Sequence, residues 1–430
     1  MDSKKIRIGL LLDAKGISSV DLSHPERGNP GVGGTQYCFL LLAYYLNKFY
    51  ESEYDIYIFS YEQLKLPNGI QSILIQDLND LPRVTESIDI IIAKQSNDYQ
   101  YYDILDDCSS SKIIIWAHNF LFGDIANRIA KSDRIKAVVF VSKQMYDFYV
   151  DHDIIKKSTP IFNIVPYIKT DEREIPEIPT ITYMGQISKS KGIIDLLKIW
   201  KRVSQIYPEA QLNIIGAGNL YDRNVELGRH GISDEYTESL MKPYIEDEYG
   251  NIRKNIHFLG VLGEEKYDIF SKSTVGVVNP SASTETFGLG IVEMAHAYLP
   301  VVTRNWNGHP DTALHKKTAL LGYTINQMTR YINSLIKNRR LNIEFGKNAK
   351  QCAERFSAIN IIPLWDSLFQ DIITEKYDRH IKRISRPYLN NYKFLREINA
   401  FFRHKISLKI IPSFVEMETI IYNLLKRRKN

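Results

Sequence analysis

Two successive series of short apolar runs, each alternating with helical patterns, constrain this chain more than any other feature. The first series predicts strands at Ile6–Leu12, Asp55–Phe59, Ile88–Ala93, Ile113–Ala117 and Ala137–Val141. The second predicts strands at Ile181–Met184, Gln211–Ile215, Ile256–Leu259, Val275–Asn279 and Pro300–Thr303. Helices are expected between them, notably at Thr35–Asn47, Ile193–Val203 and Gly288–Ala297. Strands that alternate with helices form parallel sheets, so the class is α/β with two doubly wound sheets.

The boundary between the two series falls in a charged, proline-bearing segment, Thr170–Thr180, which we interpret as a domain linker. This predicts Rossmann-like domains at residues 1–169 and 180–355. Each opens with a strand, a glycine-bearing loop and a helix. Ligands of doubly wound sheets bind at the carboxyl ends of the strands, so two such edges facing each other would form a cleft.

Composition fits a protein of the cell interior. The chain has 430 residues, 44% of them hydrophobic, which is enough for two cores. Its three cysteines, Cys38, Cys108 and Cys352, form no CxxC pair, so neither a disulfide framework nor a zinc site is expected. The apolar run Ile8–Leu12 ends at Asp13, too soon for a signal peptide or a membrane span. We therefore expect a cytoplasmic protein.

The segment from Asn279 to Glu293 is the most informative. A buried strand is predicted to end at Asn279, and a helix to begin near Gly288 after a polar loop. The backbone N–H groups of Phe287, Gly288 and Leu289 would then be free at a helix N-terminus. Such groups, together with the helix dipole, bind phosphate.

Two glutamates of this segment have open interpretations. Glu293 lies in an apolar helical run, where a carboxylate needs a hydrogen-bond donor. Ribose hydroxyls would serve, and so would a neighbouring lysine or arginine. Glu285 lies in the loop, where it would meet sugar hydroxyls or simply be solvated.

Other segments carry weaker signals of the same kind. Gly185 follows a strand and Lys191 precedes the next helix, which suits a diphosphate but also an ordinary loop. The Gly33-Gly34 loop matches neither the ATP nor the NAD fingerprint, and a flexible turn is the alternative. His118 ends a predicted strand, although a lone histidine is more often structural.

Metal and nucleic-acid functions find little support. The only Asp-x-Asp match, Asp151-His152-Asp153, follows a helical pattern, and we interpret it as solvated charge. No other spacing suits metal ligands, so neither a metal nor another cofactor is expected. The basic C-terminal segment matches no nucleic-acid recognition motif.

Taken together, these segments resemble the retaining glycosyltransferases of family 4, which have the GT-B fold. The resemblance runs from about Ile6 to Ile373. In order, its elements are the Gly33-Gly34 loop, His118, G-x5-K-G ending at Gly192, L-x-I-x-G-x-G from Leu212 to Gly218, F-L-G from Phe258 to Gly260, E-x7-E from Glu285 to Glu293, and P-V-V from Pro300 to Val302. Residues 356–376 resemble the helix that closes this fold by crossing back to the first domain.

The resemblance implies a role for each of these residues. Glu293 would hold the ribose of a nucleotide-diphosphate sugar, and Glu285 would contact the transferred sugar. Lys191 and the amides of Phe287, Gly288 and Leu289 would bind the diphosphate beside Gly185 and Gln186, with Gly33 and Gly34 closing over it. His118 would lie beside the transferred sugar. The family stabilises the leaving diphosphate with amides and basic side chains rather than with a metal.

The chain departs from the family pattern at several positions. Gln186 stands where the family usually has arginine, which removes a positive charge and puts catalytic rate in doubt unless Lys189 compensates. Tyr167 replaces a common asparagine, and Tyr298-Leu299 replace a glycine before P-V-V. The segment Leu220–Asn255 is long and charged, and we interpret it as an insertion beside the donor site.

The tail, residues 377–430, lies outside the resemblance. It holds 13 Lys and Arg against 4 Asp and Glu, in a chain whose net charge is only +5. Its apolar residues fall on one helical face, and its basic residues lie mostly elsewhere. The face comprises Leu395, Ile398, Phe401, Phe402, Ile406 and Ile410. Two interpretations stay open: contact with an anionic membrane surface, or packing on the body of the protein.

The sequence thus predicts a retaining, metal-independent transferase that moves a hexose from a UDP- or GDP-sugar to a glycan or lipid-linked acceptor. Cell-surface polysaccharide or lipopolysaccharide synthesis at the cytoplasmic membrane face is the expected setting. Two rivals remain: a protein that binds a nucleotide sugar without transfer, and a different sugar chemistry such as epimerisation or phosphorolysis.

Overall fold

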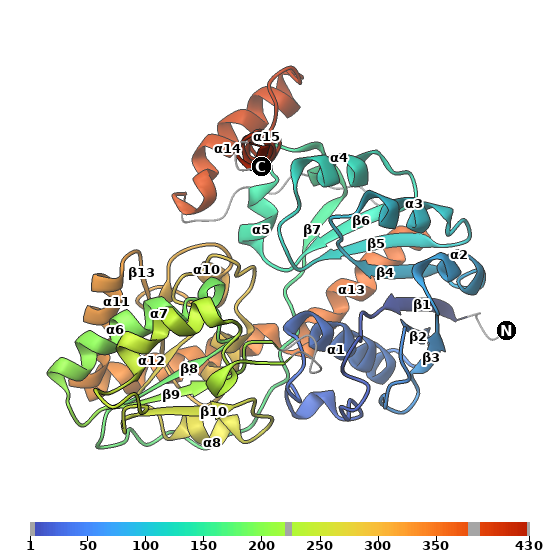
Figure 1. The fold of residues 1–430 in the computed structure, drawn as a ribbon. Helices are drawn as coiled ribbons and strands as arrows, with labels where there is room; N and C mark the ends of the chain where they lie inside the picture. Colours follow the sequence, from blue (N-terminus) through green and yellow to red (C-terminus); the bar gives the residue numbers. More distant parts are fainter. Residues whose placement is uncertain (1–4, 220–225, 377–387, 428–430) are drawn as a thin grey trace. The chain divides into compact units, whose positions relative to one another are not determined.

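A computed structural model describes residues 5–219, 226–376 and 388–427. The chain divides into two compact units. Unit 1 comprises residues 1–14, 38–163 and 361–430, and unit 2 comprises residues 15–37 and 164–360. Each unit has its own sheet with helices on both faces, as Figure 1 shows.

The described residues of unit 1 form seven parallel strands in the order β3-β2-β1-β4-β5-β6-β7. The strands are β1 Ile6–Leu11, β2 Tyr54–Ser60, β3 Gln71–Leu74, β4 Ile90–Lys94, β5 Lys112–Ala117, β6 Ile135–Phe140 and β7 Ser158–Pro160. The helices with residues in this unit are α1 Gly34–Phe49, α2 Leu81–Val84, α3 Tyr99–Asp107, α4 Gly123–Lys131, α5 Lys143–Phe148, α13 Ala358–Ile373, α14 Lys393–Ala400 and α15 Phe414–Arg427. The strand order reverses between β1 and β4, which is the switch point of a doubly wound sheet.

The described residues of unit 2 form six parallel strands in the order β10-β9-β8-β11-β12-β13. The strands are β8 Thr180–Met184, β9 Gln211–Ile215, β10 Ile256–Gly260, β11 Val275–Val277, β12 Val301–Arg304 and β13 Ala319–Gly322. The helices are α6 Ile193–Ile206, α7 Glu235–Ile245, α8 Lys266–Ser271, α9 Leu289–His296, α10 His309–Thr312, α11 Ile325–Lys337 and α12 Arg339–Ala353. The switch point lies between β8 and β11, so the loops that follow these two strands meet at one edge.

The sequence prediction of two doubly wound α/β sheets is confirmed, and every predicted strand is present. Predicted and observed bounds differ by one or two residues at most ends, as for Ile88–Ala93 against β4. Three strands were missed, namely β3, β7 and β13. Helix α5, which follows β6, is capped by Ser142, whose hydroxyl accepts a hydrogen bond from the Met145 amide.

The interpretation of Leu220–Asn255 as an insertion needs revision. Residues 220–225 lie outside the described part of the chain, but the rest supplies α7, the helix between β9 and β10. Ile232, Met241 and Ile245 are buried in the main core of unit 2. This segment is therefore part of the fold's framework rather than an addition to its surface.

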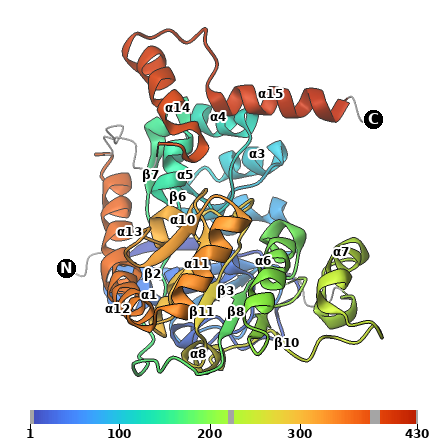
Figure 2. The ribbon, with the colours of Figure 1, turned by 90° about the vertical axis from the view of Figure 1, so that its left-hand side faces the viewer.

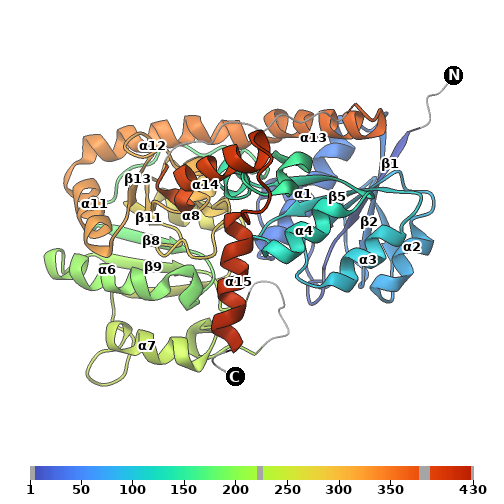
Figure 3. The ribbon, with the colours of Figure 1, turned by 90° about the horizontal axis from the view of Figure 1, so that it is seen from above.

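The tail packs on unit 1 through its polar side. Helix α14 lies against α5, and α15 lies against α4, as the views in Figures 2 and 3 show. The Lys393 ammonium lies 2.9 Å from the Asp147 carboxylate, with both side chains almost fully buried. The Thr419 hydroxyl accepts a hydrogen bond from the Gly123 amide at 2.7 Å. Packing on the body, one of the two interpretations of the tail, is thus what the structure shows.

Asp151 and His152 correct the interpretation of Asp151-His152-Asp153 as solvated charge. Both are fully buried. The Asp151 carboxylate accepts hydrogen bonds from the Phe414 amide at 2.7 Å and the Asn399 amide at 2.9 Å, both in the tail segment. Asp153 is more exposed and pairs with Lys156 at 2.8 Å. The prediction failed because the groups that satisfy Asp151 are about 250 residues away in sequence.

Candidate functional site

The loops after β8 and β11 meet at the switch point of unit 2. Gly185 directly follows β8 and has a φ of +157°, outside the range of ordinary residues. A Cβ on Gly216 would lie 2.0 Å from the Gly185 carbonyl oxygen, so the loops after β8 and β9 are in backbone contact. A Cβ on Gly192 would lie 2.6 Å from the Ser281 amide nitrogen of the loop after β11. The glycines at these positions therefore let three loops converge.

Glu285 lies at the centre of this convergence and is held on both carboxylate oxygens. Its Oε2 lies 3.2 Å from the Lys191 ammonium and accepts a hydrogen bond from the Asn279 side-chain amide at 3.3 Å. Its Oε1 accepts the Gly288 backbone N–H at 3.0 Å. Burial opposes ionisation, but Lys191, His309 and Asn279 outweigh it and lower the pKa of Glu285 to about 2. Glu285 is thus an anion at neutral pH, and it is not the solvated loop residue of the alternative interpretation.

The Gly288 amide therefore differs from its prediction. It was expected to be free for phosphate, but Glu285, three residues earlier, accepts its hydrogen. Helix α9 begins at Leu289, so the amides of its first turn still point out of a helix N-terminus. Phe287 precedes this turn and is buried, with its ring packed against Phe356.

Glu293 lies inside α9 and is paired rather than free. Its Oε1 accepts a hydrogen bond from the Lys266 ammonium at 2.5 Å, and the Lys266 side chain is only 3% exposed. This is the ion pair that sequence analysis left open as the alternative to a ribose contact. Within the described part of the chain no side chain or amide donates to Oε2, so the pair leaves that oxygen for a second donor such as a ribose hydroxyl.

The remaining donor-site predictions of unit 2 lie near the same edge. The Gln186 side chain donates to the Gly218 carbonyl and so ties the β8 loop to the β9 loop. The Gly33 amide donates to the Gln36 side chain at 3.0 Å. A Cβ on Gly34 would lie 3.2 Å from the Leu289 side chain, which places this loop against the start of α9.

Lys189 is the residue expected to compensate for the positive charge that Gln186 lacks. Its ammonium lies 5.2 Å from the centre of the Tyr236 ring, in α7. Whether it also serves a diphosphate stays a prediction.

His118 belongs to unit 1, at the end of β5. It is buried against Trp116, with ring centres 4.6 Å apart, and against Phe39 at 5.9 Å. Its backbone N–H donates to the Gln95 side chain at 2.8 Å. Burial, helped by the charge of Lys94, lowers the pKa of His118 to about 3. The imidazole is therefore neutral at physiological pH and suits hydrogen bonding rather than proton donation as a cation.

Sequence reasoning missed two side chains that the structure adds to the site. Lys266 carries no motif, so nothing in the sequence marks it as the partner of Glu293. His309 follows β12 in the run Gly308-His309-Pro310, and it is fully buried beneath the Glu285 loop. A Cβ on Gly288 would lie 3.1 Å from its ring. His118 was selected because it follows the end of a strand. The same reasoning applied after β12 would have selected His309.

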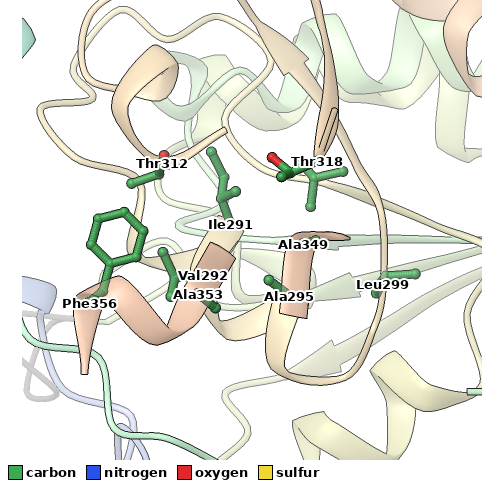
Figure 4. A pocket seen from close by; sticks show the side chains of 10 residues that line it. Ile291, Val292, Ala295, Leu299, Thr312, Thr318, Ala349, Ala353 and Phe356 are labelled. Carbon is green, nitrogen blue, oxygen red and sulfur yellow. The ribbon is translucent and has the colours of Figure 1, made fainter. Parts of the chain in front are cut away.

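Two hollows within the described residues are lined by other side chains than these. One of about 10 Å³ lies behind α9, between Ile291 and Ala295 on one side and Ala349 and Phe356 on the other (Figure 4). It could hold at most about one water molecule and is a packing gap. A larger hollow of about 630 Å³ is lined by residues 170–177 and by α8.

Comparison with known proteins gives the fold of the chain and a family match within unit 2. The family described as "Glycosyl transferases group 1" matches residues 168–352, which covers the switch-point loops of unit 2. In fold, the chain is similar to HepE of Anabaena in complex with UDP and glucose, with a TM-score of 0.64 at 14% identity, over 85% of this chain and 99% of that one. This chain has the GT-B fold, and its residues 168–352 match the glycosyltransferase group 1 family. Membership of the chain as a whole in a glycosyltransferase family, family 4 included, stays a prediction.

The other proteins to which this chain is similar differ in the reactions that their names give. It is similar to sucrose-phosphate synthase of Thermosynechococcus elongatus, with a TM-score of 0.64 at 16% identity over 86% of this chain and all of that one. In sequence it is 25% identical to trehalose synthase of Pyrococcus horikoshii, over 51% of this chain and 48% of that protein. It is 30% identical to a GDP-mannose-dependent alpha-1,2-mannosyltransferase of Dictyostelium discoideum, over 26% of this chain and 22% of that protein. The chain thus spans less than half the length of these two curated relatives.

The described part of the chain lacks two features, a membrane-spanning helix and a cluster of metal ligands. Within residues 5–219, 226–376 and 388–427, no helix is both long and apolar enough to cross a membrane. The same part of the chain contains no group of three or more His, Cys, Asp or Glu side chains that could hold a metal ion.

Proposed function

We propose that this GT-B protein transfers a hexose from a nucleotide-diphosphate sugar, with unit 2 binding the donor. The observation that carries the proposal is the cluster of Lys191, Glu285 and the N-terminus of α9 at the switch point, inside the region that matches the glycosyltransferase family. Doubly wound sheets bind nucleotides at this place, and a helix N-terminus beside a lysine suits a diphosphate. HepE, which shares the fold, was solved with UDP and glucose.

In this proposal Glu285 keeps the place of the diphosphate when no donor is bound. A carboxylate oxygen and a phosphate oxygen are both anionic acceptors, and Glu285 engages the Lys191 ammonium and the Gly288 amide that a phosphate would use. A bound donor would take over these contacts and release the carboxylate toward the sugar hydroxyls. Positive charge and oriented amides would then stabilise the leaving diphosphate. The predicted retaining mechanism, which uses no metal, depends on this stabilisation.

The acceptor and the setting belong to the same proposal. We infer a glycan or lipid-linked acceptor in cell-surface polysaccharide or lipopolysaccharide synthesis, at the cytoplasmic face of the membrane. The fold relation supports a sugar chemistry, and the tail supports the membrane setting. His118 would contact the transferred sugar as a neutral hydrogen-bonding group, since its pKa is about 3.

The test is a binding and turnover series on the full chain. UDP, GDP, ADP and CMP, with their sugar conjugates, are screened by thermal shift with and without EDTA, because specific binding stabilises the folded state by ~2.7 kcal/mol at a hundredfold excess over Kd. We expect one nucleotide diphosphate to shift the melting temperature in EDTA, and Lys191→Met to remove the shift. No shift with any nucleotide would overturn the donor site.

Turnover separates the proposal from its rivals. Release of nucleotide diphosphate that depends on an added acceptor supports transfer. Conversion of the donor sugar without an acceptor would identify an epimerase, and dependence on inorganic phosphate a phosphorylase. Binding without consumption across varied acceptors would leave a nucleotide-sugar-binding protein.

A further inference from the structure

The C-terminal tail is amphipathic in the opposite sense to an ordinary surface helix. In α14 and the π-helical turn that follows it, the large buried side chains are polar or basic, at Lys393, Arg396, Asn399 and Arg403, beside the small Ala400. Most of the exposed side chains from α14 to the end of the turn are large and apolar, while Glu397 and Lys405 are exposed charges. The apolar ones, with Ile406 just after the turn, comprise Phe394, Leu395, Ile398, Phe401, Phe402 and Ile406. A surface helix of a soluble protein normally buries its apolar stripe.

Specific partners on unit 1 hold the basic side inward. Lys393 pairs with Asp147 at 2.9 Å. The Arg396 guanidinium lies 3.9 Å from the centre of the Phe148 ring, donates to the Phe148 carbonyl at 2.9 Å, and pairs with Glu418 of α15 at 2.5 Å. Rotating the helix about its axis to bury the apolar face would separate these charges from their partners. Charge pairing therefore fixes which face of the tail is buried.

Helix α15 also leaves an apolar face exposed, although its buried side is mixed. Val415 and Thr419 are buried on the side toward α4, and Thr419 accepts the Gly123 amide there. The opposite face exposes Ile420, Ile421, Leu424 and Leu425. Figures 2 and 3 show α14 and α15 as two helices at an angle, joined by a short connection that exposes Leu408, Ile410 and Ile411.

The exposed charges of the tail select the occupant of this apolar face. Lys405, Lys409 and Lys426 are exposed in these segments, with Lys409 3.3 Å from Asp153, against one exposed carboxylate, Glu397 of α14. Two copies of the face brought together would place like charges opposite each other, which is unfavourable. The headgroups of an anionic bilayer complement the lysines, and its acyl region accepts the apolar side chains. Tyr388, Tyr392 and Tyr422 are exposed as well, and tyrosine suits a boundary between apolar and wet surroundings.

We propose that the outward apolar face of α14, the 406–411 connection and α15 inserts into the surface of an anionic lipid bilayer, with Lys405, Lys409 and Lys426 at the headgroups. This deepens the membrane part of the proposed function and is independent of the transfer reaction. It also changes the expected mode of binding: the apolar face makes the contact, while the buried basic residues hold the tail on unit 1.

The experiment is co-sedimentation of the full chain with vesicles in the absence of nucleotide. Vesicles of phosphatidylcholine with a quarter phosphatidylglycerol are compared with vesicles of phosphatidylcholine alone. The test variant is Phe401→Asn/Leu424→Asn, at two side chains that are each 55% exposed. The matched control is Ile206→Asn/Ile359→Asn, at exposed apolar side chains of unit 2 that are 57% and 73% exposed.

We expect the wild type and the control to bind the mixed vesicles, and the test variant to bind at least tenfold more weakly. Lys405→Gln/Lys426→Gln should reduce the preference for the anionic vesicles, and part of the binding should survive 0.5 M NaCl. An unchanged melting temperature and unchanged nucleotide binding of the test variant show that it is folded.

Three results would overturn the proposal: no binding by the wild type, equal binding by the test variant, or binding that high salt abolishes completely. A dimer in sedimentation velocity that the test variant dissociates would assign the face to a second copy instead. Failure of the donor screen would leave these outcomes unaffected, so the two proposals fail separately.

Discussion

The Lys266–Glu293 pair makes the obvious test of the donor site ambiguous, and it also shows how to repair that test. Glu293→Ala removes the carboxylate proposed to bind ribose, but it also leaves the Lys266 ammonium, 3% exposed, without its partner at 2.5 Å. An unpaired buried charge costs about 3–5 kcal/mol. Total stability of a folded protein is only about 5–15 kcal/mol, so this single change should remove a large part of it.

A second variant separates the loss of stability from the loss of donor binding. For a unit of this size, each kcal/mol shifts the melting temperature by about 2–4 °C, so Glu293→Ala should lower it by roughly 6–20 °C. Replacing both charges, in Lys266→Met/Glu293→Met, removes the pair without stranding either member. Such replacements are often neutral or stabilising, so the double variant should melt close to the wild type.

Donor affinity should instead fall in both variants. Hydrogen bonds to a charged acceptor contribute about 1.5–3 kcal/mol, which corresponds to a 10- to 140-fold rise in Kd. The assay is calorimetric titration of the nucleotide diphosphate identified in the screen, with unfolding in urea measured on the same samples. A stable double variant that binds the nucleotide as the wild type does would refute the ribose role of Glu293. A single variant that melts like the wild type would refute the reasoning from the buried pair.

The remaining predictions concern the other charges of the structure. Glu285→Gln should tighten binding of the nucleotide diphosphate about tenfold, or ~1.4 kcal/mol, because the competing anion is gone, while transfer slows; titration and turnover report each effect. Asp147→Ala should cost about 3–5 kcal/mol by removing the carboxylate from the buried Lys393 ammonium, which keeps its hydrogen bond to the neutral Gln144 side chain, and limited proteolysis should then cleave the tail sooner. His118 and His296 have folded pKa values lowered to about 3 by burial and by Lys neighbours, so the unfolded chain binds more protons below pH 6.5. Unfolding free energy in urea should therefore decrease as pH falls from about 6.5 toward 3, and less steeply in His118→Phe.

The sequence was sufficient for the strands of the sheet interiors and for the edge strand β10, but it missed the other edge strands. Of these, β13 is buried but has only four residues. Central strands such as β5 are buried on both faces and so are continuously apolar. The edge strand β3, Gln71–Leu74, is partly exposed along its length, and β7 has only three residues. Neither carries the apolar run that a search for buried strands detects, because an edge strand needs less burial than a central one.

Within the site, residue spacing predicted where the two glutamates lie but not which side chains pair with them. The E-x7-E spacing placed Glu285 and Glu293 correctly in a loop and a buried helix. Their partners, Lys191 and Lys266, lie 94 and 27 residues away and follow no repeat. A buried carboxylate needs a donor, which is predictable, whereas the identity of that donor depends on which loops the fold brings together.

The orientation of the tail was also not predictable from the sequence. It decides how much of the positive charge of the tail is exposed. A helical period defines two faces but does not say which one is inward. Here Asp147 and Glu418 decide, because burying the basic face satisfies charges on both sides, and the apolar face is left outside. Lys393, Arg396 and Arg403 therefore contribute to the +9 of the tail in sequence but are buried in the structure. Salt should consequently weaken membrane binding less than the net charge of the tail suggests, since apolar contact is not screened.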